Sequence, residues 1–387
     1  MHRGRGVLLP GLVPPARPMR SPVSLCLSVS TFHSLHIAPV RCGLFRPCCV
    51  HEIFASSAFP CFLTGLACAL VINHSRVKQG FGKLTLPRIL VAGNPTLDEL
   101  VDRGNVTVRP GGTALFASCA AAFLGSRVGI LGCIGQDYPD ATLKSLKALH
   151  VDIGDLAKAS GRSTRFRISR FNGSRRLQLI EPGHSVEPRS NLVPVQSIHL
   201  GPVFNEISSS LVKTLRRKCD FLSADLQGFI RKSTNTGLVH LVRRRIGGLL
   251  NQCDLVQASL DEAQSQLQLR SPTKIARKLL RHGVHFAILT MGKRGSWLVT
   301  RSEGLHRIPA YSDSGIRDST GAGDVFAGSW LSTYLSTRDP VWSSAVGSAF
   351  ASLASRKTGI SKFHMSRGEL LRRAGWVYNR VEASAIY

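Results

Sequence analysis

Acidic residues are scarce in this 387-residue chain, which has 23 Asp and Glu against 50 Lys and Arg. The resulting net charge of +27 favours nucleic acid or an anionic substrate as a partner. Long runs of like charge are also missing, since the longest basic runs are the triplets 216–218 and 243–245. Zinc-finger spacing and aromatic-basic RNA motifs are absent as well. The scattered charge therefore disfavours nucleic acid and leaves a small anionic ligand as the expectation.

Paired cysteines are a second absence. The ten cysteines form neither a disulfide framework nor a metal-ligand spacing, and six of them precede residue 86. The other four, Cys119, Cys133, Cys219 and Cys253, stand alone in ordinary or apolar segments. This pattern suits a reducing compartment, and we expect a cytoplasmic protein.

The first 85 residues lack any sustained helical or strand period and hold nine Lys and Arg against one acid. Residues 53–72 carry no charge, which is long enough for a membrane span, although Pro60, Gly65 and several Ser and Thr weaken that interpretation. The stretch starts too late for a signal peptide. An anchor, a targeting extension and upstream sequence from a misplaced start are the alternatives, and no methionine lies between Met19 and Met291. We expect residues 1–85 to lie outside the fold, residues 86–387 to form one domain, and no membrane partner.

From Arg88 onward the chain alternates between short apolar runs and helical stretches. The runs are typical of buried strands, and such alternation predicts an α/β fold with a mainly parallel sheet covered by helices on both faces. The expected strands are Ile89–Gly93, Val128–Gly132, Asp254–Ala258 and Phe286–Thr290, and the clearest helices are Ala114–Leu124 and Leu143–Leu149.

One segment departs from this alternation. Residues 164–168 and 177–180 alternate apolar and polar side chains on either side of Asn172-Gly173, a strong hairpin signal. An antiparallel ribbon does not belong inside a doubly covered parallel sheet. We expect it to form a small β lid, built from segments near 100–110 and 163–182.

The two common phosphate-binding motifs are absent. GxxxxGK[ST] does not occur, and GxGxxG fails because Phe326 stands where the third glycine belongs. Residues 318–330 nevertheless read DSTGAGDVFAGSW, and the apolar stripe after Gly323 predicts a helix. Its first amides and its dipole attract anions. Asp324 would lie beside that anion, either as a reacting carboxylate or as a capping residue.

This stretch resembles the C-terminal signature of the ribokinase family of carbohydrate kinases, the phosphofructokinase-B group. The resemblance covers residues 86–374 and implies that Asp324 is the catalytic base and that Gly321, Ala322 and Gly323 form the anion hole. Other matching segments imply further roles. Asp98, Gly111 and Gly112 would bind the acceptor, Thr290, Gly292 and Gly295 would bind the nucleotide, and residues 132–137 match a Gly-x-x-Gly-x-Asp stretch.

Three positions depart from the family pattern. Phe116 stands where Asn is frequent, which suggests a different sugar-binding arrangement. Ser259-Leu-Asp-Glu262 replaces Asn-x-x-Glu, and its glutamate implies a magnesium role for Glu262. Ser348 stands near the expected adenine site, where Asn is frequent.

The resemblance implies an enzyme that uses ATP and Mg2+ to phosphorylate a hydroxyl of a small sugar, polyol or nucleoside. It also raises the expectation of a homodimer through the lid. The alternatives are a nucleoside kinase of the same fold, a non-catalytic sugar- or nucleotide-binding regulator and a basic nucleic-acid-binding protein.

Overall fold

The computed structural model describes residues 88–384, except 103, 172–173 and 189–191. The predicted extension 1–85, its uncharged stretch 53–72 and the predicted Asn172-Gly173 turn lie outside the described residues.

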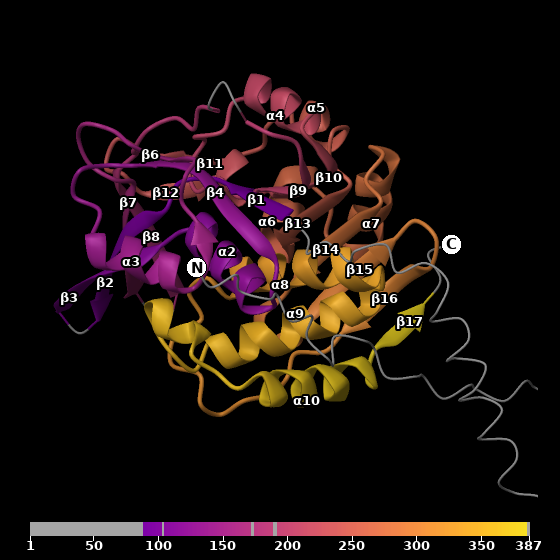
Figure 1. Cartoon of the computed structure of the whole chain (residues 1–387). Coiled ribbons are helices and arrows are strands. Elements are labelled where there is room, and N and C mark those ends of the chain that lie inside the picture. The colour runs from indigo at the N-terminus through magenta and orange to yellow at the C-terminus, as the bar shows by residue number, and fades with distance from the viewer. Residues whose placement is uncertain (1–87, 103, 172–173, 189–191, 385–387) are drawn as a thin grey trace, which may run out of the picture. The chain divides into compact units, whose positions relative to one another are not determined.

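A single large sheet organises the described chain, as Figure 1 shows. All pairings from β14 through β13, β10, β9, β1 and β4 to β5 are parallel, and those from β14 through β15 and β16 to β17 are antiparallel. In spatial order the strands are β17 (Glu382–Ser384), β16 (Gly304–Ile308), β15 (Ser296–Thr300), β14 (Phe286–Thr290), β13 (Leu255–Ser259), β10 (Cys219–Asp225), β9 (Val195–Leu200), β1 (Arg88–Ala92), β4 (Arg127–Ile134) and β5 (Val151–Asp152), with β6 (Leu156–Lys158) also on β4.

Helices cover both faces of this sheet, which confirms the predicted fold class. In Figure 1 the gold and yellow helices α8, α9 and α10 lie on the side opposite α4 and α5. The helices are α2 (Thr113–Phe123), α3 (Asp140–Ala148), α4 (Ser209–Arg216), α5 (Gly247–Leu250), α6 (Leu260–Leu267), α7 (Pro272–Arg281), α8 (Ala322–Thr337), α9 (Pro340–Ala354) and α10 (Arg367–Tyr378).

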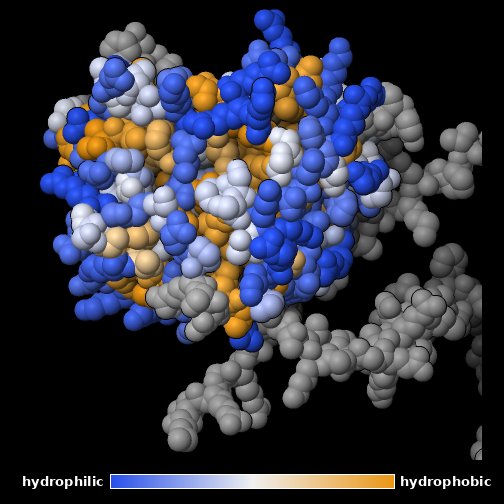
Figure 2. All heavy atoms as spheres, turned by 90° about the horizontal axis from the view of Figure 1, so that it is seen from above, coloured by the Kyte–Doolittle hydropathy of each residue, from blue (hydrophilic) through white to orange (hydrophobic). Residues whose placement is uncertain are grey.

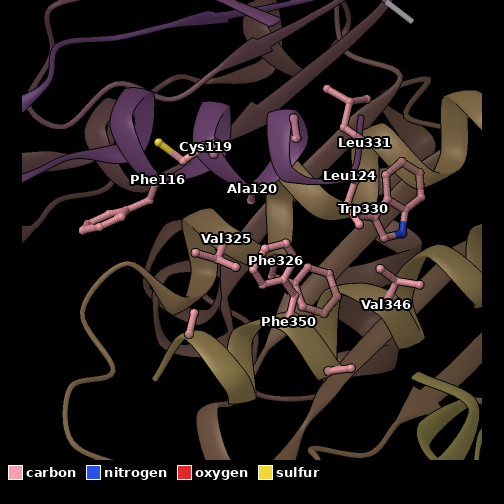
Figure 3. Packing of buried hydrophobic residues seen from close by; sticks show 14 of the residues in the cluster. Phe116, Cys119, Ala120, Leu124, Val325, Phe326, Trp330, Leu331, Val346 and Phe350 are labelled. Atoms are coloured by element: carbon pink, nitrogen blue, oxygen red, sulfur yellow. The ribbon is translucent and has the colours of Figure 1, made fainter. Parts of the chain in front are cut away.

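The sheet separates two hydrophobic cores. Because strand side chains alternate, Ile89 and Val91 of β1 enter one core while Leu90 and Ala92 enter the other. The first core packs α2, α8, α9 and α10, and Figure 3 shows its α2 and α8 side chains facing one another. Trp330 of α8 is fully buried there, and its indole Nε1 donates to Ser344 Oγ at 3.0 Å. The second core packs α4 to α7.

A separate four-stranded sheet corresponds to the predicted lid. Its order is β3 (Asn105–Gly111), β2 (Thr96–Asp102), β7 (Arg165–Phe171) and β8 (Ser174–Glu181). The pairs β2–β3 and β7–β8 are antiparallel as expected, but β2 and β7 pair in parallel. β2 follows β1 and β7 follows β6, and because β1 and β6 both run parallel to β4, β2 and β7 leave the main sheet at the same end. A short hairpin, β11 (Arg231–Ser233) with β12 (Val239–Leu241), adjoins β8 through a bridge between Gln178 and Leu238.

The surface reflects the composition of the chain. Figure 2 shows a mostly hydrophilic face on which hydrophobic residues emerge between charged side chains. Within the described residues, none of the helices combines the length and the apolar character that a membrane crossing requires.

Candidate active site

The carboxyl ends of the parallel strands gather the polar groups of the site. Asp225 ends β10, Ser259 ends β13 and Thr290 ends β14, all at one edge of the sheet. Open α/β sheets bind ligands at this edge because the loops that leave it face a crevice. The N-terminus of α8 reaches the same place, since the Gly323 carbonyl accepts a hydrogen bond from Gln257 Nε2 of β13 at 2.9 Å.

The start of α8 requires glycine for two reasons. Gly321 is the N-cap and has a left-handed φ of 76°, and a Cβ there would collide with the ring of Phe116. Its lack of a side chain also leaves the helix without a side-chain cap. The Ala322 N–H donates to Ser319 O at 3.1 Å, and Gly323 is exposed. The dipole of α8 and the exposed Gly323 make this end of the helix favourable for an anion, whereas the Ala322 N–H is used within the loop.

Asp324 is fixed by residues from two other parts of the chain. Its Oδ1 accepts a hydrogen bond from Thr113 Oγ1 at 2.8 Å and a longer one from Gln227 Nε2 at 3.3 Å. Gln227 is itself held by Arg231, whose Nη2 donates to Gln227 Oε1 at 2.7 Å. Asp324 lies in the first turn of α8, but its Oδ1 is directed to these donors, so its orientation is set by tertiary contacts.

Phe116 lies against Gly321 at the start of α8. Its ring packs against Gly321 and is 5.9 Å from Lys362 Nζ, measured to the ring centroid. The Phe116 side chain is 3% exposed and supports Gly321, and its effect on sugar binding stays a prediction.

Acidic side chains accumulate next to α8. Asp225 is 6% exposed, and burial together with the charges of Glu262 and Asp324 holds the pKa of its carboxyl well above the usual range. Gln227 N–H donates to Asp225 Oδ1 at 2.9 Å, and Gln257 Nε2 lies 3.4 Å from Oδ2. Concentrated negative charge of this kind calls for a cation.

Glu262 also has a structural role. Its Oε2 accepts the Ser259 N–H at 2.8 Å while its own N–H donates to Ser259 Oγ at 3.2 Å, which forms a capping box at the start of α6. Ser259, which departs from the family pattern, thus supplies the cap.

The residues predicted to bind the acceptor lie together. Asp98 of β2 faces Arg109 of β3 in the lid register and is 7% exposed. A Cβ on Gly111 would collide with Asp98 Oδ2, and Gly112, with φ of 89°, passes close to the Asn94 carbonyl. Gly112 directly precedes Thr113, so this group connects to Asp324 through one hydrogen bond.

The residues predicted to bind the nucleotide surround the β14–β15 turn. Thr290 pairs with Ser259 in the sheet, Gly292 begins the turn, and Gly295 ends it with φ of 87° against the Ile308 carbonyl. Ser348 is on α9, where its Oγ donates to Pro309 O at 2.8 Å. Gly295 and Ser348 therefore meet the same segment, but the Ser348 hydroxyl is engaged by the protein.

The structure adds residues that the sequence did not indicate: Thr113, Asp225, Gln227, Arg231 and Gln257. Thr113 was the easiest of these to predict from the sequence, since it follows the Gly-Gly pair directly. Asp225 ends a strand that the sequence analysis did not identify.

Comparisons with known proteins show what this chain is similar to. A family model described as pfkB family carbohydrate kinase matches residues 81–365. A cytidine kinase from Thermococcus kodakarensis is 24% identical over 258 residues, which make up 64% of this chain and 88% of that protein.

Solved structures show the same fold. A pyrophosphate-dependent kinase in the ribokinase family, complexed with a pyrophosphate analog and myo-inositol, superposes with a TM-score of 0.62 at 19% identity, covering 71% of this chain and 99% of that one. Arabidopsis thaliana ribokinase, complexed with ribose and ATP, gives a TM-score of 0.60 at 15% identity, covering 75% and 99%. The ribokinase-like fold expected from the sequence is thereby confirmed.

Proposed function

Because the chain belongs to the pfkB family of carbohydrate kinases, we propose that it transfers the terminal phosphoryl group of ATP to a hydroxyl of a small sugar, polyol or nucleoside. The observation that carries the proposal is the Asp324 carboxylate, held by Thr113 and Gln227 in the first turn of an anion-accepting helix. Asp98, Gly111 and Gly112 would hold the acceptor on the other side of Thr113.

Asp324 takes the proton of the acceptor hydroxyl in this mechanism. The hydroxyl oxygen forms the new bond to the terminal phosphorus as the bond from that phosphorus to the bridging oxygen breaks, and ADP leaves with the bridging oxygen. The loop Gly321-Ala322-Gly323 stabilises the charge on the transferred group through the Gly321 and Gly323 amides and the α8 dipole, while the Ala322 N–H closes the turn by donating to Ser319 O. Thr113 and Gln227 keep the base in one orientation, so little reorganisation is needed during transfer.

The nucleotide would lie along Thr290, Gly292 and Gly295, with its terminal phosphate at α8. Ser348 would contribute by holding the Pro309 segment, since its hydroxyl already binds that carbonyl. Neighbouring structures carry either ATP or a pyrophosphate analog, so the donor is part of the proposal and needs its own test.

Magnesium fits the acidic cluster. Asp225 and Glu262 supply the hard oxygen ligands that the ion prefers, and the Gln257 Oε1 atom is buried without a hydrogen-bond partner in the described part of the chain. No three His, Cys, Asp or Glu residues within 88–384, outside the undescribed gaps, are grouped to hold a metal by themselves. Phosphate and water oxygens would therefore complete the coordination. When bound, the ion neutralises charge on the phosphates.

Two further expectations belong to this proposal. The described cysteines, Cys119, Cys133, Cys219 and Cys253, are all free, which supports a reducing, cytoplasmic location. Val106 and Val108 of β3 are 56% and 51% exposed, which supports a homodimer through the lid. A solution mass of a single chain at micromolar concentration would contradict the dimer.

A substrate panel tests the proposed reaction. Purified full-length protein is incubated with Mg2+, with ATP or pyrophosphate as donor, and with ribose, fructose, myo-inositol, cytidine or adenosine as acceptor. Phosphorylated product is detected directly by mass spectrometry. We expect one acceptor class to be phosphorylated with ATP. Ligand binding without any product would favour the regulator.

Asp324→Asn identifies the base. The substitution keeps the size of the side chain and its ability to accept from Thr113, so stability should change little. Loss of a general base typically lowers turnover about 10²–10⁴-fold, and nucleotide affinity should stay near normal. Asp140→Asn is the matched control, because Asp140 is an exposed aspartate in the first turn of α3. Wild-type turnover by the Asp324 variant would reduce Asp324 to a structural residue.

A further inference from the structure

Lys362 is a buried lysine beside the loop of residues 318–323, which contains Gly321 and Gly323. It lies in the 3-10 turn η3 (Gly359–Phe363), and its side chain is 1% exposed. Burial lowers the pKa of its ammonium group, and Asp318 opposes that effect. A lysine rarely occupies such a position unless its charge is paired.

The partner of Lys362 is the residue that begins the loop. Lys362 Nζ donates to the Asp318 backbone carbonyl at 2.7 Å and lies 3.4 Å from the Asp318 carboxylate Oδ2. The other carboxylate oxygen of Asp318 accepts the Thr320 N–H at 2.9 Å. One ammonium group thus holds a residue whose carboxylate shapes the turn into Gly321.

The loop is supported from further directions. The backbone N–H groups of Arg317 and Asp318 both donate to Ser355 O, at 2.9 and 3.0 Å. The ring of Phe116 packs against Gly321 and also lies near the Lys362 ammonium. The turn from Asp318 to Gly321 is therefore confined by α2, the end of α9 and η3.

The charge of Lys362 also reaches the site. Asp324 and Arg109 both act electrostatically on its ammonium group, Asp324 favourably and Arg109 unfavourably. A hydrogen bond to the Asp318 carbonyl could be made by a neutral donor, and an apolar side chain could fill the volume. What a lysine adds is a positive charge on the buried side of a loop that accepts phosphate.

We propose that Lys362 is a positioning residue that acts as a built-in cation for the loop of residues 318–323, which leads into α8. It sets the conformation of residues 318–321 through Asp318, and its charge favours an anion at the first turn of α8. The inference rests on the proposed function, because it assumes that this loop receives the transferred phosphoryl group.

Two substitutions separate charge from packing. Lys362→Met keeps the length and apolar volume, and Lys362→Gln keeps a donor for the Asp318 carbonyl, but neither carries a charge. Lys357→Met is the matched control, since Lys357 is exposed and donates to the His364 carbonyl in the same region. Melting temperature shows which variants fold, and binding is compared among folded ones.

Binding of pyrophosphate is measured by titration calorimetry without acceptor. Because both variants remove the positive charge behind the loop, we expect them to bind pyrophosphate about 10- to 100-fold more weakly. Turnover should fall similarly while the KM for the acceptor stays within about threefold. The Lys357 variant should match the wild type. A lower melting temperature with unchanged pyrophosphate affinity and turnover would show a purely structural lysine and overturn the proposal.

Chemical rescue gives a second readout. Lys362→Ala leaves a cavity at the end of which a small cation could take the place of the ammonium group. Methylammonium or ethylammonium should restore part of the lost turnover, whereas tetramethylammonium at equal ionic strength should not. Equal effects of all three salts would contradict the inference. If the wild type neither binds pyrophosphate nor phosphorylates any acceptor, the proposed function itself fails. If the wild type is active and the Lys362 variants are equally active, only the proposed role of Lys362 fails.

Discussion

Gln227 shows how single residues define this site. Its amide joins Asp324, Thr113 and Arg231, which lie on three different parts of the chain. The sequence alone could indicate Asp324, because a carboxylate next to a glycine loop is unusual chemistry. It could not indicate Gln227, which is 97 positions away and whose residue type belongs to no pattern. The residue proposed to react carries a sequence signal, whereas the residues that orient it are defined by the fold.

Glu262 caps α6 and has a proposed magnesium role, and a substitution can separate the two. Glu262→Gln removes the charge but still offers an oxygen to the Ser259 N–H, so the capping box should persist. We expect turnover to fall at least about tenfold at low Mg2+ and to recover partly at high Mg2+, because a phosphate-bound ion needs a carboxylate partner. Turnover measured across a Mg2+ series checks this.

Ser259→Ala is the control for this prediction. It removes the other half of the capping box and should cost about 1 kcal/mol of stability without changing the Mg2+ dependence. If both variants follow the wild-type Mg2+ curve, Glu262 is only a helix cap.

At the scale of elements, the strongly apolar strands and the weaker β13 could be predicted, whereas β9 and β10 could not. β1, β4 and β14 were indicated by short runs of aliphatic residues. β9 and β10 include Ser197, His199 and Ser223 in buried positions, so their sequences are less apolar although they lie in the middle of the sheet. The β7–β8 hairpin was indicated by its alternation, but the parallel pairing of β2 with β7 joins segments far apart in the sequence, which no local pattern reveals.

The lid should behave as a unit of low stability. Among the described residues, the cluster that holds its β7 side chains has Phe166, Ile168 and Val203 as buried members, far fewer than either main core. Small cores open locally more often, so amides of β7 and β8 should exchange hydrogen faster than those of β1 and β13. Adding the acceptor should slow exchange in β7 and β8 and leave β13 unchanged, as mass spectrometry of peptides would show. Equal protection in lid and sheet without ligand would contradict a closing lid.

At the scale of the whole molecule, the sheet between the two cores contains an ionisable group. His199 of β9 is 1% exposed, and its Nδ1 lies 2.9 Å from Ser223 Oγ on the neighbouring strand. Burial lowers the pKa of this imidazole from 6.5 to about 4. The imidazole is therefore neutral in the folded protein at physiological pH, and its protonation is coupled to unfolding of the entire sheet.

The sign of this coupling gives a prediction for stability. Between pH 6.5 and 4 the unfolded chain binds a proton at His199 and the folded chain does not, so acid should favour unfolding. The loss begins as pH falls below about 6.5 and approaches about 3 kcal/mol near pH 4, since each pKa unit is worth ~1.4 kcal/mol. His199→Asn keeps a neutral polar group near Ser223 and cannot be protonated. Urea unfolding at pH 7, 6, 5 and 4 should show the wild type losing more stability than the variant, whose remaining slope reports the carboxylates. Parallel curves for the two proteins would contradict the prediction, because they would mean that His199 binds protons equally in the folded and unfolded states.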